Sequence, residues 1–64
     1  MDSSEFIGLT KRTAQDKAEA KNAIFRLIRI DDRAFFDYPL PDDVRTDRVC
    51  VEIENGAVVK AAVQ

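Results

Sequence analysis

Hydrophobic and polar residues alternate most regularly over residues 48–54, where every second side chain is apolar. The apolar positions are Val49, Val51 and Ile53. Asn55-Gly56 follows directly, and this dipeptide is typical of a tight hairpin turn. The pattern predicts a hairpin of strands 48–54 and 57–63, in which 48–54 covers a core on one side only. The register of 57–63 stays open, because Lys60 interrupts its alternation.

The residues before this hairpin predict a helix and a further strand. Thr10 can cap a helix through its hydroxyl, and residues 11–22 are good helix formers. Their alanines let the helix lie close on a sheet, namely Ala14, Ala18 and Ala20. Residues 24–30 are rich in β formers, although they alternate imperfectly. We expect a single α+β domain over residues 1–64, with one helix on a small mixed sheet and a flexible arm at 1–6.

The connection between the first two long strands, residues 31–47, has no helical pattern and contains two prolines. A long irregular connection in so small a domain is usually functional or disordered. Its aromatic residues are Phe35, Phe36 and Tyr38. Exposed aromatics on a stiffened loop are typical anchors of interfaces. The alternative is that Phe35 or Phe36 belongs to the core and the segment is a plain crossover.

Length and composition limit the classes of function. A chain of 64 residues buries only about 60% of its unfolded surface, so assembly into a homo-oligomer is a plausible source of stability. Its one cysteine, Cys50, permits no intrachain disulfide and suits a reducing compartment. The first residues contain no apolar run for a signal peptide or membrane span, and we expect a cytoplasmic protein. The net charge of -2 gives no field that favours nucleic acid.

The chain offers little catalytic chemistry. It has no histidine, its one cysteine cannot form a zinc site, and its two glycines form no phosphate loop. The acid pairs at 31–32 and 42–43 are expected to be solvated loop charges. We therefore expect neither an enzyme nor a cofactor or metal.

The segment Phe35-Phe36-Asp37-Tyr38, followed by Arg45-Thr46-Asp47-Arg48-Val49, resembles the binding-loop region of potato-inhibitor-type serine protease inhibitors, the chymotrypsin-inhibitor and eglin group. The order of helix, strand, loop, strand and hairpin is similar over residues 7–63. The resemblance implies a long exposed binding loop between the first two strands. Phe36 would then fill a protease pocket with Asp37 just after the presented bond. Arg45 and Arg48 match the arginines that support the loop from below, whereas their alternative role is that of surface charges paired with nearby aspartates.

Three departures weaken what the resemblance implies about inhibition. Phe35 stands where the family has a small hydroxyl residue, residues 39–44 form an insertion, and Cys50 replaces a second supporting arginine. An enlarged loop would not keep the short, taut geometry of the family.

Two other binding functions remain open. Several arginines lie near the aromatic residues in sequence: Arg26, Arg29, Arg33, Arg45 and Arg48. Guanidinium groups pair with phosphates and rings stack on bases, so a cytosolic oligomer could sequester a small nucleotide, as some phage counter-defence proteins do. The same loop could also block a protein that is not a protease. Across these hypotheses the candidate loop-supporting or ligand-binding residues are Arg33, Arg45 and Arg48.

Overall fold

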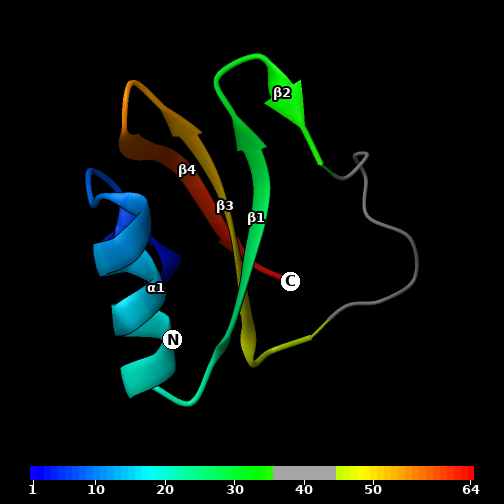
Figure 1. The fold of residues 1–64 in the computed structure, drawn as a ribbon. Helices are drawn as coiled ribbons and strands as arrows, with labels where there is room; N and C mark the ends of the chain where they lie inside the picture. Colours follow the sequence, from blue (N-terminus) through cyan, green and yellow to red (C-terminus); the bar gives the residue numbers. More distant parts are fainter. Residues whose placement is uncertain (36–44) are drawn as a thin grey trace.

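The computed structural model describes residues 1–35 and 45–64, and in this part of the chain one α-helix lies on a four-stranded sheet (Figure 1). The elements are a 3-10 helix η1 (Ser3–Phe6), the helix α1 (Lys11–Ala20), and the strands β1 (Ile24–Ile30), β2 (Arg33–Ala34), β3 (Arg48–Glu54) and β4 (Ala57–Val63). The expected α+β architecture is confirmed. The predicted bounds of the three long strands are those of β1, β3 and β4.

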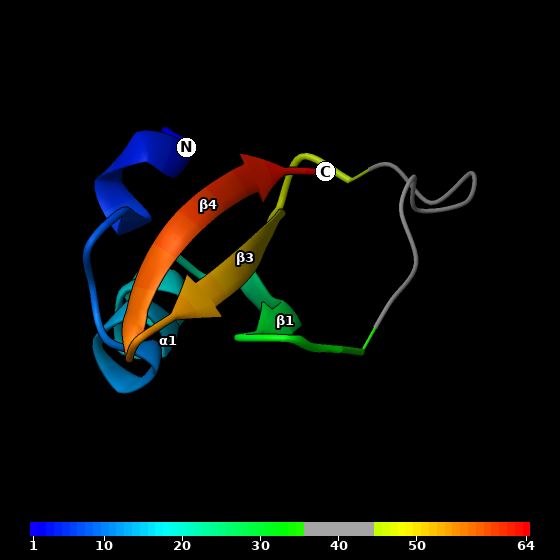
Figure 2. The same cartoon turned by 90° about the horizontal axis from the view of Figure 1, so that it is seen from above.

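The strand order is β2-β1-β3-β4, and the central pair of β1 and β3 is parallel. The two outer pairs are antiparallel. Figure 2 shows α1 on one side of the sheet. Because parallel strands start at the same end of a sheet, the chain has to return along the sheet between β2 and β3. The chain between β2 and β3 includes the connection in which the sequence predicts the binding site.

The helix α1 is held at both ends by its own sequence. At its start the Thr10 hydroxyl accepts a hydrogen bond from the Thr13 N–H at 3.2 Å, as the sequence predicts. At its end Asn22 takes a positive φ of 56°, and the Ala23 N–H donates to the Ala18 carbonyl at 2.9 Å. This is a Schellman motif, which ends the helix at Ala20 instead of Asn22.

The expectation of a loose arm at residues 1–6 is wrong. Phe6 is fully buried in the core, and the Asp2 carboxylate caps η1 by accepting from the Ser4 N–H at 3.0 Å. On the surface Glu5 pairs with Lys17 of α1 at 3.5 Å and with Lys21, directly after the helix, at 3.7 Å. The polar composition of the segment conceals the one large apolar side chain that fixes it.

Gly8 and Leu9 attach the N-terminal segment to the edge of β4. The Gly8 N–H donates to the Val58 carbonyl, and the Val58 N–H donates to the Leu9 carbonyl, both at 2.8 Å. Gly8 has a φ of +85°. Gly8 and Leu9 thus both lie opposite Val58, and the first of them is a glycine in the left-handed conformation. This arrangement is a β-bulge of the G1 type.

The prediction that β3 covers a core on one side only is wrong as well. Val49, Val51 and Ile53 face the core under α1, but Arg48 and Cys50 on the opposite face are only 2% and 1% exposed. A second buried layer therefore lies on the side of the sheet away from the helix. Ile28 of β1 is 1% exposed and lies outside the core cluster under α1.

The irregular alternation of the two strands beside β3 has a structural cause. The pairing of β1 with β3 shifts between Leu27 and Arg29, so Ile28 is an extra residue. In β4 the shift places Val58 opposite Ile53 and Lys60 opposite Glu52, so Val59 is extra. The turn between β3 and β4 follows the sequence prediction, since Asn55 and Gly56 both have positive φ values, 52° and 78°.

We predict that Phe6→Ala lowers the free energy of unfolding by about 3 kcal/mol or more, because a fully buried aromatic ring is removed from the core. Urea denaturation followed by circular dichroism measures this change. Ile7→Ala is the matched control, since the neighbouring Ile7 side chain is 48% exposed. An equal, small effect of both substitutions would show that η1 does not belong to the cooperative fold.

Candidate functional site

Phe35 stands at the start of the return connection, directly after β2. Its side chain is 47% exposed, so for Phe35 the alternative of a core position is excluded. The Phe35 N–H donates to the Ile28 carbonyl at 2.7 Å, which fastens its backbone to β1. The ring is therefore presented from a rigid base.

Arg33 of β2 is the side chain that accompanies this ring. Its guanidinium carbon lies 5.6 Å from the centroid of the Phe35 ring, within the range of a cation–π interaction. β2 pairs Arg33 with Ile30 and Ala34 with Arg29, and this short hairpin sets the position of Arg33. Arg33 and Phe35 are both predicted site residues, but β2 itself is not predicted, because a strand of two residues has no periodic signal.

Phe36, Asp37 and Tyr38 lie outside the described residues, as does the 39–44 insertion. The next described residue, Arg45, forms a two-pronged ion pair with Asp47. Its Nε and Nη2 donate to the two Asp47 carboxylate oxygens at 2.8 and 2.9 Å. These hydrogen bonds hold the pKa of Asp47 below its ordinary value. This pairing is the one expected if Arg45 acts as a surface charge.

The Asp47 backbone ties the end of the connection to the sheet. Its carbonyl accepts from the Ile24 N–H at 2.7 Å, directly before β3 begins. The connection is thus bonded to β1 at both of its described ends, through Ile28 near the start and Ile24 near the finish.

Arg48, the first residue of β3, is not a surface charge. Its residue is 2% exposed, and its Nε donates to the Gln64 carbonyl at 2.9 Å. In the reverse direction the Gln64 N–H donates to the Arg48 carbonyl at 3.2 Å, and the Cys50 sulfur lies 3.7 Å from the Gln64 carbonyl oxygen. Arg48 thus lies at the foot of the connection, by which we mean the point where the connection ends and β3 begins. A buried guanidinium with fixed partners is suited to positioning the backbone next to it.

The arginines of the nucleotide hypothesis do not share one environment. The Arg29 Nε donates to Glu52 at 2.8 Å, and its Nη1 lies 3.3 Å from Glu54. The hydrogen bond to Glu52 raises the pKa of Arg29 above its ordinary value. The charges of Arg29 and Arg45 are thus balanced by carboxylates, whereas Arg26 lies in β1 opposite Cys50.

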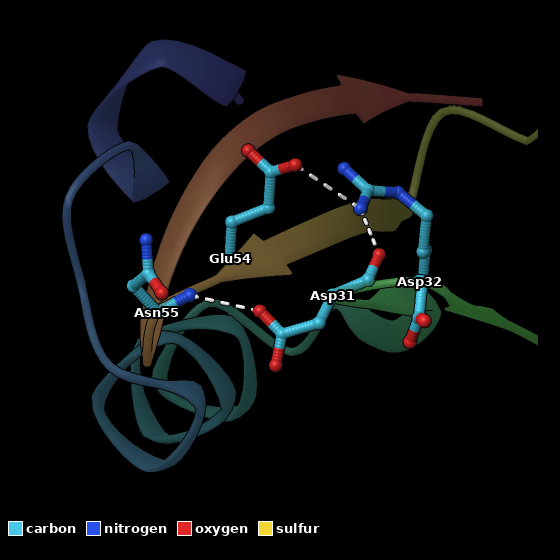
Figure 3. Close-up of a pocket in the computed structure, with 5 residues that line it drawn as sticks. Asp31, Asp32, Glu54 and Asn55 are labelled. Atoms are coloured by element: carbon cyan, nitrogen blue, oxygen red, sulfur yellow. Dashed lines mark hydrogen bonds and ion pairs between the residues drawn. The ribbon is translucent and has the colours of Figure 1, made fainter.

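A shallow hollow at the end of the sheet near the β1–β2 and β3–β4 turns is lined by Arg29, Asp31, Asp32, Glu54 and Asn55 (Figure 3). The Asn55 N–H donates to the Asp31 carboxylate at 3.0 Å, and Arg29 donates to the Asp31 carbonyl. These bonds join the two turns, so Asp31 has a structural role. In the part of the chain described here, no three His, Cys, Asp or Glu side chains are grouped to hold a metal ion.

No family model, curated protein or solved structure matches this chain. Within residues 1–35 and 45–64, no helix has the length and apolar character needed to cross a bilayer. The resemblance to potato-inhibitor-type proteins therefore depends on the sequence motif and on the order of the elements.

We predict that Arg45→Gln raises the carboxyl pKa of Asp47 toward its ordinary value, because the two hydrogen bonds that favour the charged form are weakened. A folded-state pKa below the unfolded one contributes stability above the unfolded pKa, and this contribution is lost as the pH falls through the folded pKa. NMR titration of the Asp47 carboxyl carbon between about pH 5 and pH 2 covers this range. Arg12→Gln on α1 should leave the titration unchanged, and an unchanged Asp47 midpoint in Arg45→Gln would contradict the ion pair.

Proposed function

We propose that the protein is an inhibitory binding protein that engages a serine protease through the connection between β2 and β3. The observation that carries the proposal is that this connection is fastened to one rigid sheet at both described ends. Phe35 is bonded to Ile28 at its start, and Asp47 is bonded to Ile24 at its finish. Fixed ends reduce the entropy that a loop loses when it docks, and rigidity keeps an inhibitor from being released as a cleaved product.

The chemistry of the described residues supports the same role. Phe35 offers a half-exposed ring with Arg33 beside it, and aromatic rings and arginines are the most frequent anchors of protein interfaces. Arg48 lies buried at the foot of the connection, where the resemblance expects a supporting arginine. Phe36 remains the leading candidate for the residue that fills the protease pocket, with Asp37 and Tyr38 beside it.

The connection also lies between the first two long strands, β1 and β3, where the resemblance to potato-inhibitor-type proteins implies a binding loop. This resemblance is part of the proposal and accounts for the choice of serine proteases as targets. A nucleotide ligand is less favoured, because the guanidinium groups of Arg29 and Arg45 are already paired with carboxylates.

The direct test measures inhibition constants against chymotrypsin-like, elastase-like and subtilisin-like proteases. We expect the wild-type chain to inhibit at least one of them and to remain uncleaved during long incubation. Phe36→Ala should weaken inhibition by roughly thirtyfold, corresponding to about 2 kcal/mol for an interface anchor. Val59→Ala is the control, since Val59 is 45% exposed on β4, which β3 separates from the strand to which both described ends of the connection are bonded.

Two outcomes would count against the proposal, the first against the inhibitory function and the second against Phe36 as the anchor. The first is a wild-type chain that leaves every protease of the panel active, in which case calorimetry with cyclic nucleotides tests the alternative ligand. The second is a Phe36→Ala chain that melts at a lower temperature while its folded fraction inhibits as well as the wild type. That result would place Phe36 in the core.

A separate prediction concerns Arg48. Arg48→Lys should lower the free energy of unfolding by about 2 kcal/mol, because lysine cannot place a donor at the Nε position that bonds the Gln64 carbonyl. It should also raise the inhibition constant by loosening the foot of the connection. Chemical denaturation and inhibition assays on the same samples separate the effects, and Arg12→Lys on the exposed face of α1 serves as the control. A fully stable, fully inhibitory Arg48→Lys chain would remove Arg48 from the supporting role.

A further inference from the structure

The outer edge of β4 is only partly covered. At one end Val58 is bonded to Gly8 and Leu9. At the other end the Gln64 N–H donates to Arg48, so Gln64 faces β3. Backbone groups of successive residues in an antiparallel strand point alternately to the two sides, so those of Ala61 and Val63 point away from the sheet. Among the residues that the structure describes, no further strand bonds to them.

The two edges of the sheet differ in how they are protected. The β2 edge is only two residues long and carries the charged Arg33. The β4 edge is seven residues long and apolar except for Lys60, which is ion-paired with Glu52 at 3.7 Å. Natural proteins shorten, charge or cover their edge strands to prevent pairing with other chains. Beyond Val58 the protection of this edge is limited to the bulge at Val59 and to Lys60, whose charge is paired with Glu52.

The 3-10 helix η1 packs beside β4, but none of the described backbone hydrogen bonds joins the N-terminal segment to Ala61 or Val63. Figure 2 shows the blue N-terminal segment beside β4, with the red C-terminal end of the strand extending past it. A strand that approaches the edge there would meet the outward backbone groups of Ala61 and Val63.

We propose that this edge binds the same edge of a second copy, so that two sheets join into one continuous eight-stranded sheet. The two-fold axis would pass beside Ala62, with Ala61 opposite Val63 of the second copy and Lys60 opposite Gln64. In this register all four outward-pointing residues of the pair exchange hydrogen bonds, and no like charges face each other. A chain of 64 residues also gains more than a large domain from an added partner, because its own core is small.

The register gives a charge-exchange test. Ala62 would face Ala62 of the second copy in the pair type that brings side chains closest. Ala62→Glu alone and Ala62→Lys alone should each weaken dimerisation by about tenfold, because like charges meet at the axis. An equimolar mixture should restore the dimer as a heterodimer. Sedimentation equilibrium and native mass spectrometry follow the mass of the wild type, both variants and the mixture.

Val59→Glu and Val59→Lys are the matched controls on the same strand. Val59 is exposed, and in the proposed register no residue of the second copy from 1 to 64 lies opposite it. These variants should dimerise like the wild type. Misfolded Ala62 variants would not be rescued by mixing, so circular dichroism first establishes that both variants are folded. Rescue then supports the interface, and failure of rescue between two folded variants overturns it. A wild-type chain that stays monomeric up to about 1 mM also overturns it.

Discussion

The parallel pairing of β1 with β3 is the constraint on which the rest of the structure depends. It places the central strands side by side and forces a return of the chain along the sheet. The short strand β2 begins that return by folding back on β1. The ion pair of Arg45 with Asp47 and the buried Arg48 lie where the return meets the sheet again. The parallel pairing therefore accounts for the long connection, and both described ends of this connection are hydrogen-bonded to β1.

The sequence predicts this architecture well where its signals are local. The alternation from 48 to 54, the Asn55-Gly56 turn and the Thr10 cap each depend on neighbouring residues, and each is confirmed in the structure. The burial of Phe6 depends on contacts with elements more than 40 residues away, such as Val49 and Val58. No local pattern could separate that residue from the polar segment around it.

The candidate site is less predictable for the same reason. Exposure of Phe35 and stacking by Arg33 follow from a two-residue strand, which has no signature in the sequence. The burial of Arg48 and Cys50 follows from layers on both faces of β3, whereas the alternation of apolar and polar residues indicated one. The adjacent apolar residues Leu27 and Ile28 were the available signal that the opposite face is also buried.

The two extra residues beside β3 form β-bulges at the same level of the sheet. Ile28 lies between the partners of Val51 and Glu52, and Val59 lies between those of Glu52 and Ile53, so both irregularities flank the same point of the central strand. On β3 the apolar side chains alternate without interruption. On β1 and β4 the side chains that face α1 are one residue out of step on the two sides of the bulge. Leu27 is therefore followed by Ile30, and Val58 by Ala61, on the helix-facing side. Bulges strengthen the local twist, so the end of the sheet that carries both hairpin turns is rotated against the rest.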